Sequence, residues 1–342
     1  MIRRHMFMSA LAATVALSGC GGGNDSSATP TPTATPTPTP TASPTYAVLN
    51  PLPAATEFNT FNAAISYTGD PATSAVTLGA ASTEALNALA RVRLATDPAV
   101  ATGIYVLHEN AEESRFCKTT GQTCTATVVA DAIPANPEFI FRQDDATTAG
   151  KFAQGEFLNN VVTTVAATGV GITSDTALNL SEVSYANWWR GDSTAGQKRM
   201  TYTAWGYPTA YTDMPTTGTV SYTNRVTGRM VATTGATTTI SKTTGTMTAS
   251  VNFATGVVNM TYTLTAVPTN GAASFAVNFT TQGAIPVGQN QWTGSFIGGT
   301  LTGTTTGGFF GSQGAQLGTV YSASGTLGAS SVLLIGVAVG KK

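Results

Sequence analysis

Charged residues are scarce in this chain. They make up 10% of its 342 residues, against roughly 25% in an average soluble domain. The 16 basic residues nearly balance the 17 acidic ones, which argues against a nucleic-acid partner and against a strongly charged substrate. Threonine, alanine, glycine and serine take the place of the missing charges. Threonine-rich alternation is typical of β-structure with a polar, uncharged outer face.

Acidic residues are absent from the whole C-terminal part. No aspartate or glutamate follows Asp213, and most of the acidic residues lie between Asp70 and Asp213. Five basic residues remain after this point: Arg225, Arg229, Lys242, Lys341 and Lys342. Because acidic residues are confined to the first part of the chain, the charge distribution predicts two structural units.

Side chains for hydrolytic chemistry are also few. The chain has two histidines, His5 near the N-terminus and His108, and no histidine follows His108 at the zincin spacing. Neither a nucleophile elbow nor a P-loop lysine is present. The adjacent pairs Glu112-Glu113 and Asp144-Asp145 would point to opposite faces of a strand, unlike the facing carboxylates of a glycosidase, and are interpreted as solvated loop charges. We therefore predict no enzyme activity and no metal site, and we interpret His108 as a strand-end residue, with a haem-ligand role left open.

Only three cysteines occur, and two of them flank a short segment. In an exported protein the spacing of Cys117 and Cys124 suits a disulfide, which would contribute roughly 2–3 kcal/mol. A redox centre would more often show Cys-x-x-Cys, and a zinc site would need more ligands. The disulfide is the favoured interpretation.

No apolar run is long enough to span a bilayer. The run over residues 7–17 follows two arginines, as in a secretory signal. The next residues, Leu17-Ser18-Gly19-Cys20, resemble the lipobox of bacterial lipoproteins. This resemblance implies a signal peptide over residues 1–19 and a lipid attached to Cys20, with an ordinary cleaved signal as the alternative. Gly21 in place of an aspartate implies transport to the outer membrane, on its cell-surface or periplasmic face.

Residues 20–45 are dominated by Thr-Pro repeats, which predict an extended tether of roughly 3.1 Å per residue.

Residues 46–198 are expected to form a strand-rich handle domain, with strands over 104–107, 138–142, 151–158 and 177–189. One short helix is also expected. Ser82 and Thr83 would cap it, Glu84 suits its first turn, and Asp97-Pro98 would end it.

Apolar and polar residues alternate regularly from about residue 199. The clearest runs are Met200-x-Tyr202-x-Ala204, Met247-x-Ala249-x-Val251-x-Phe253 and Trp292-x-Gly294-x-Phe296. Turn signals separate the runs at 227–228, 254–256, 270–271 and 298–299. Many short strands without a helix to cover them favour closure, so residues 199–342 are expected to form an antiparallel barrel with a closing strand over 331–339.

Several segments resemble the transferrin-binding protein B family. Residues 307–318, GGFFGSQGAQLG, resemble a motif near the end of its barrel domain, and VNFATGVV at 251–258 resembles its recurrent hairpin. Residues 185–189, 205–206 and 214–222 are similar to the stretch that leads into that barrel. Ser312 and Gln316 replace the usual proline and glutamate, so no transferrin-binding residue is carried over.

Membership of this family would imply a mainly β, single-lobe lipoprotein with an eight-stranded barrel. It would capture a protein, or an iron- or haem-carrying ligand, for iron acquisition or immune evasion. A structural cell-envelope lipoprotein without a ligand is the alternative. A membrane-spanning pore fits the lipobox and tether poorly.

Aromatic residues concentrate between positions 185 and 211. The candidate partner-binding residues are Trp188, Trp189, Trp205, Tyr207 and Tyr211, because large amphipathic rings anchor protein interfaces. The alternative, to which we give more weight, is a core at the junction of handle and barrel.

Overall fold

The computed structural model describes residues 44–49, 51–94, 104–117, 127–129, 137–160, 179–191 and 196–342. The signal peptide, Cys20, the tether up to residue 43, and Cys124 lie outside the described residues, so the expected disulfide stays a prediction. From Ser43 onward the chain forms one compact unit. No helix in the described part of the chain is long and apolar enough to cross a membrane.

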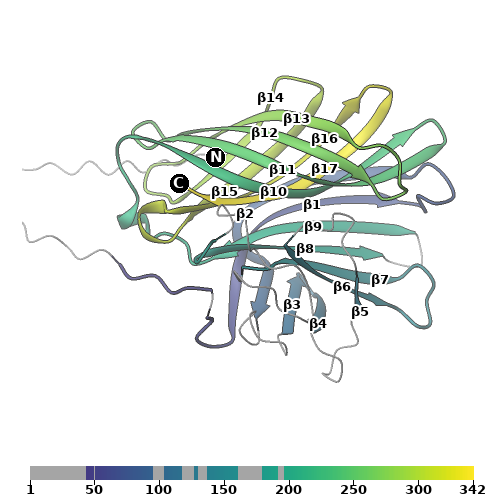
Figure 1. The fold of residues 1–342 in the computed structure, drawn as a ribbon, viewed down its shortest axis with the longest axis horizontal. Helices are drawn as coiled ribbons and strands as arrows, with labels where there is room; N and C mark the ends of the chain where they lie inside the picture. Colours follow the sequence, from purple (N-terminus) through teal and green to yellow (C-terminus); the bar gives the residue numbers. More distant parts are fainter. Residues whose placement is uncertain are drawn as a thin grey trace, which may run out of the picture. The chain divides into compact units, whose positions relative to one another are not determined.

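The first part of this unit is a nine-stranded antiparallel sheet in the order β4-β3-β2-β1-β9-β8-β7-β6-β5 (Figure 1). Its strands are β1 (Thr56–Thr68), β2 (Thr77–Leu94), β3 (Ile104–Glu109), β4 (Glu112–Cys117), β5 (Thr127–Val128), β6 (Glu138–Asp144), β7 (Phe152–Leu158), β8 (Val183–Gly191) and β9 (Gln197–Gly206). The sheet is nearly closed: the Gln143 side chain on β6 donates a hydrogen bond of 2.7 Å to the Arg115 carbonyl on β4. No backbone ladder joins β4 to β6 among the described strands. We call the line between these two strands the seam.

The prediction of a helix after Ser82 is wrong, because this stretch lies in β2. β2 pairs with β1 on one side and, at its C-terminal end, with β3 on the other. These hydrogen-bonded ladders outweigh helix propensity, which differs by less than about 1 kcal/mol per residue among ordinary side chains. The β1–β2 register shifts between Asn59↔Arg91 and Thr60↔Asn87. A bulge in β2 therefore falls within the stretch whose apolar spacing imitates a helix.

The second part is a closed barrel of eight antiparallel strands in sequence order. These strands are β10 (Thr219–Thr234), β11 (Thr237–Asn252), β12 (Val257–Pro268), β13 (Phe275–Ala284), β14 (Gln291–Ile297), β15 (Leu301–Phe310), β16 (Gln316–Leu327) and β17 (Ser330–Lys341). β17 pairs with β10 from Thr223↔Lys341 to Thr233↔Ser331, which closes the barrel. The expected eight-stranded barrel and its closing strand are confirmed.

Two details of the barrel differ from expectation. The alternating run at 200–204 lies in β9, which pairs with β8 and β1, so the barrel begins at Thr219 rather than at residue 199. The Thr227-Gly228 pair lies inside β10 rather than in a turn. A Cβ added at Gly228 would lie 2.3 Å from the Ile335 carbonyl oxygen, so this glycine allows the closing strands to approach each other.

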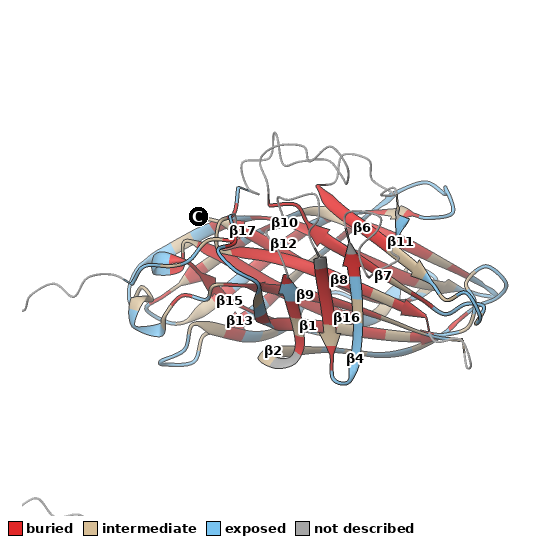
Figure 2. Ribbon diagram, turned by 90° about the horizontal axis from the view of Figure 1, so that it is seen from below, coloured by how far each residue is buried: buried red, intermediate tan, exposed pale blue. Residues whose placement is uncertain are grey.

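Three apolar clusters fill the two parts and their junction. The first fills the barrel, the second covers the inner face of the sheet, and the third lies between the sheet and the outside of the barrel. Phe309 belongs to the cluster inside the barrel and Phe310 to the cluster at the junction, on opposite faces of β15, because successive residues of a strand point to opposite faces. Buried residues run through the middle of the strands, and exposed residues gather at the turns (Figure 2).

Candidate functional site

Chain connectivity sorts the barrel turns into two ends. The turns after β11 and β13 share one end with the segment before β10 and with the C-terminus, whereas the turns after β10, β12 and β14 lie at the other. The described chain begins at the first end. There the Tyr46 hydroxyl donates a 3.0 Å hydrogen bond to the Asp213 carboxylate, and the Ala210 N–H donates a 2.9 Å hydrogen bond to the Tyr46 hydroxyl. We call this the proximal end and the other the distal end.

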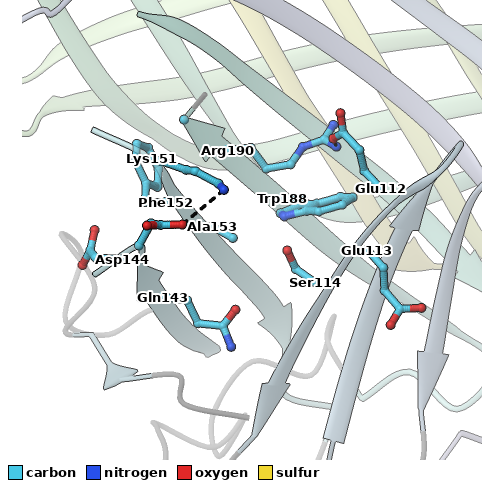
Figure 3. Close-up of a pocket in the computed structure, with 12 residues that line it drawn as sticks. Glu112, Glu113, Ser114, Gln143, Asp144, Lys151, Phe152, Ala153, Trp188 and Arg190 are labelled. Carbon is cyan, nitrogen blue, oxygen red and sulfur yellow. Dashed lines mark hydrogen bonds and ion pairs between the residues drawn. The ribbon is translucent and has the colours of Figure 1, made fainter. Parts of the chain in front are cut away.

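A cavity of about 550 Å³ lies at the seam of the sheet (Figure 3). We call it the seam cavity. It is bordered by Glu112, Glu113 and Ser114 on β4, Gln143 and Asp144 on β6, Asp145 and Lys151 in the following loop, Phe152 and Ala153 on β7, and Trp188, Arg190 and Gly191 on β8. Its volume lies within the range of roughly 300–1,000 Å³ typical of small-ligand sites.

The seam cavity lies toward the distal end. Gly191, on its border, pairs with Lys198 at the start of β9, and β9 begins opposite the end of β1. The chain that follows β1 contacts the barrel just after the β10–β11 turn, where the Thr238 hydroxyl accepts a 2.8 Å hydrogen bond from the Val76 N–H. The cavity and the first described residues therefore lie toward opposite ends.

Each carboxylate that borders the cavity already has a cationic partner. The pairs are Glu112–Arg190, Glu113–Arg115 at 2.7 Å, Asp144–Arg142 at 2.9 Å and Asp145–Lys151 at 3.1 Å. Both acidic pairs were expected in loops, but Glu112 and Glu113 lie on strand β4 and Asp144 lies at the end of β6, so only Asp145 is in a loop. The charges balance locally, so the cavity presents no unpaired charge to an ionic ligand.

Arg190 is the most constrained of these charged residues. Its guanidinium donates to Glu109 at 2.5 Å as well as to Glu112. Burial lowers the pKa of Arg190 to about 10, although the neighbouring Glu109 opposes this shift. At neutral pH the guanidinium remains charged.

Trp188 and Phe152 are the buried aromatic residues of the cavity, and Trp188 also carries a polar group. Trp188 is 3% exposed, and the Arg190 guanidinium carbon lies 3.8 Å from the centroid of its ring. Its indole N–H has no hydrogen-bond acceptor among the described residues, and Figure 3 shows this nitrogen directed into the space between Ser114 and Ala153. An unpaired buried donor costs roughly 1–3 kcal/mol. A ligand that brought an acceptor oxygen to this point would remove that cost.

The five candidate aromatic residues do not form one surface. Trp188 and Trp205 are buried on the inner face of the sheet, whereas Trp189 packs against the junction cluster on the opposite face of β8. Tyr207 is half-buried, and Tyr211 is 60% exposed in a short 3-10 helix, η2 (Tyr211–Asp213), at the proximal end. Only Trp188 of this group borders the seam cavity.

The buried cations of the acid-free barrel pair with carboxylates of the sheet. Arg229 on β10 and Lys242 on β11 are cross-strand partners. Arg229 forms an ion pair with Glu156 on β7, and Lys242 forms ion pairs with Glu138 on β6 and, at 3.3 Å, with Glu156. We call these four residues the junction network. The sequence showed the uneven distribution of charge, but nothing in it indicated which residues pair.

The electrostatics of the junction network favour its ionised form. Glu156 is fully buried, and it accepts hydrogen bonds of 2.7 Å from Gln154 and 2.5 Å from Asn187. Burial raises the pKa of Glu156, but Arg229 and Lys242 outweigh this effect and lower it to about 2. Glu156 likewise raises the pKa of Arg229 against the effect of burial. The network is therefore a structural junction that stays charged at neutral pH.

His108 is engaged within the sheet. Its Nδ1 accepts a 2.8 Å hydrogen bond from Arg91, and its Nε2 donates to the Asn110 carbonyl oxygen. Both ring nitrogens are thus occupied by protein groups. In the part of the chain that the structure describes, no cluster of three or more histidine, cysteine or acidic residues could hold a metal ion.

A near-closed sheet packed on a closed eight-stranded barrel defines a mainly β protein of two parts. Residues 214–340, which include almost the whole barrel, match the family model described as the C-lobe and N-lobe beta barrels of Tf-binding protein B. The C-terminal part of this chain is therefore a barrel domain of the transferrin-binding protein B type. That family consists of non-enzymatic binding proteins.

Similar solved structures cover most of the chain at low identity. A double mutant of the vaccine antigen Transferrin Binding Protein B from Haemophilus parasuis Hp5 is 12% identical, with 85% of this chain and 77% of that chain covered and a TM-score of 0.35. Intact Ap-TbpB, with its N and C lobes, is 10% identical, with coverages of 87% and 79% and a TM-score of 0.35. A DUF3598-family protein of unknown function from Nostoc punctiforme is 10% identical, with coverages of 84% and 95% and a TM-score of 0.21. No curated protein sequence matches the chain.

Proposed function

We propose that this protein is an outer-membrane lipoprotein, anchored through Cys20, that captures a protein ligand at the seam cavity. The observation that carries the proposal is the buried indole N–H of Trp188, which faces the cavity without an acceptor. The barrel domain of the Tf-binding protein B type adds support, because its family consists of surface lipoproteins that bind proteins. The lipobox resemblance and the Thr-Pro tether support the anchor.

The charge balance of the cavity favours a peptide segment as the bound part of the ligand. A peptide carbonyl is a neutral acceptor for the Trp188 N–H, and peptide N–H groups suit the side-chain oxygens of Ser114 and Gln143. Haem propionates would instead need free cations, but Arg190 and Lys151 are already paired. A protein, including an iron-carrying protein, therefore suits the site better than free haem.

The test measures binding of transferrin, of haemoglobin, and of proteins from iron-limited growth medium to the full chain purified in detergent. We expect one of these proteins to bind. We expect the Trp188→Phe variant, which keeps an aromatic ring and lacks the N–H, to bind about 5- to 20-fold more weakly. Trp292→Phe is the matched control, because Trp292 is buried inside the barrel and should leave binding unchanged.

Two further measurements separate the anchor from the capture role. Labelled palmitate should enter the wild-type chain and not the Cys20→Ala variant, whatever the ligand. If lipidation is normal but no protein binds, and protease added to intact cells does not reach the chain, the structural envelope lipoprotein becomes the better explanation.

A further inference from the structure

An uncharged, partly apolar surface lies at the proximal end of the barrel. Residues of three segments line it: Tyr211, Met214, Pro215 and Thr216 before β10, residues 253–256 after β11 and residues 285–289 after β13. Asp213, which lies between the first two of these residues in the chain, does not line it. The three segments enclose a hollow of about 260 Å³, and none of its lining residues carries a charge. Val287 is fully exposed, and Tyr211 is 60% exposed. We call this region the loop surface.

Backbone hydrogen bonds hold these segments together. The Ile285 N–H donates a 2.8 Å hydrogen bond to the Gly256 carbonyl oxygen, which links the turns after β11 and β13. The Phe253 N–H donates a 2.9 Å hydrogen bond to the Gly218 carbonyl oxygen, which links the first of these turns to the segment before β10. The exposed side chains are therefore presented by a connected frame, so little ordering is needed when they contact another surface.

The start of the described chain lies at this same end. Tyr46 bonds to Asp213 and Ala210, immediately beside Tyr211. The residues that connect this point to Cys20 belong to the tether, so a lipid on Cys20 would attach the chain to the membrane through its proximal end. The distal seam cavity would then be the part directed away from the membrane.

The charges at the proximal end also suit a lipid surface. β17 ends here at Lys341, Lys342 follows it, and the Lys342 ammonium donates a 3.0 Å hydrogen bond to the Gln313 carbonyl oxygen. The carboxylate of Asp213 accepts hydrogen bonds from the Tyr46 hydroxyl and the Gln313 N–H, at 3.0 Å and 2.9 Å. Basic residues next to an apolar, aromatic-bearing surface favour anionic headgroups with apolar side chains inserted at the interface.

We propose that the loop surface docks on the lipid bilayer, with Val287 and Tyr211 inserted at the headgroup level. This inference rests on the lipid anchor proposed above, because the tether supplies a high effective concentration of bilayer and a weak contact then suffices. Complete burial of one valine side chain favours the docked state by roughly 10- to 100-fold. Docking would hold the protein with the seam cavity of the sheet facing away from the membrane.

The experiment places a tryptophan at each end of the barrel in the full lipidated chain. Val287→Trp marks the loop surface, and Ile297→Trp is the matched control, because Ile297 is 44% exposed at the distal turn after β14. Both variants are reconstituted into vesicles of brominated phosphatidylcholine and phosphatidylglycerol, and the quenching of the parent chain is subtracted. We expect at least twofold more bromine quenching for Val287→Trp than for Ile297→Trp, with unchanged melting temperatures for both.

Equal quenching of the two variants in a chain with normal palmitate incorporation would overturn the docking and leave the anchor intact. Absence of palmitate incorporation would instead refute the anchor. A spectral change of Val287→Trp that requires a higher protein concentration, or an added protein ligand, would assign the loop surface to a second copy or to that ligand, and would also overturn the proposal.

Discussion

The junction network offers the sharpest test of how the two parts of the molecule hold together. Replacing Glu156 with glutamine keeps the shape of the side chain and removes its charge. Arg229, which is 5% exposed in its side chain, then loses its carboxylate partner within a buried site. Lys242 retains Glu138. The perturbation therefore isolates one buried cation without a compensating anion.

The expected cost follows from this geometry. Removing one partner of a buried ion pair destabilises a protein by about 3–5 kcal/mol, a large share of a typical total of about 5–15 kcal/mol. Removing both charges, in the double variant Glu156→Leu/Arg229→Met, should restore most of this loss, because apolar replacements of buried pairs are often close to neutral. Arg229 remains protonated in the single variant, since guanidinium groups do not release their proton near neutral pH.

The assay is urea unfolding at pH 7, followed by tryptophan fluorescence. The midpoint for Glu156→Gln should fall with an unchanged dependence on urea concentration. Glu113→Gln is the control, because the exposed Glu113–Arg115 pair should contribute under about 1 kcal/mol. If Glu156→Gln shifts the midpoint no more than Glu113→Gln does, the junction network does not stabilise the fold as argued.

The same residue predicts a pH dependence. The pKa of Glu156 is about 2 in the folded protein, below its usual value of 4.5, because Arg229 and Lys242 outweigh the effect of burial. When folding lowers the pKa of a carboxyl group, the ionised group stabilises the fold at pH values above the pKa of that group in the unfolded chain. This contribution is lost as the pH falls through the lower pKa of the folded state. The wild type should therefore lose stability between about pH 4.5 and pH 2 more steeply than Glu156→Gln does.

Two further predictions concern the backbone and the cysteines. Gly206 has a φ of 150°, and a Cβ there would lie 1.9 Å from the Glu182 carbonyl oxygen, so Gly206→Ala should lower the free energy of unfolding by at least about 3 kcal/mol. Gly235→Ala, with a φ of 56° and open space around it, should cost only about 1 kcal/mol in the same urea assay. Cys124→Ser should lower the free energy of unfolding by roughly 2–3 kcal/mol. A reducing agent should lower the free energy of unfolding of the wild type to the value of the variant and leave the variant unchanged. If wild type and variant are equally stable under oxidising conditions, the disulfide is refuted.

Local patterns in the sequence were sufficient to predict the barrel. Alternation of apolar and polar residues depends only on the two-residue period of a strand, so the runs around Met247 and Trp292 could be identified without tertiary information. The same rule placed Phe309 and Phe310 on opposite faces, one inside the barrel and one against the sheet. Where two local patterns competed, as in the stretch after Ser82, the sequence favoured a helix, and pairing with β1 and β3 produced a strand.

The candidate site depended on contacts that no local pattern describes. The sequence identified Trp188 as one of five aromatic residues, but it did not indicate that β4 returns beside β6–β8 and forms a cavity next to that indole. Glu138 and Lys242 are 104 residues apart in the chain, and their pairing exists only because the sheet packs on the barrel.

The sequence by itself thus determined that the C-terminal half forms strands with a polar, uncharged outer face, because strand periodicity is a property of neighbouring residues. The tertiary structure alone decided which buried charges meet, where the seam cavity lies, and that Val287 and Tyr211 share the end at which the described chain begins. These features depend on the register and curvature of whole sheets, which bring together residues that are distant in the chain.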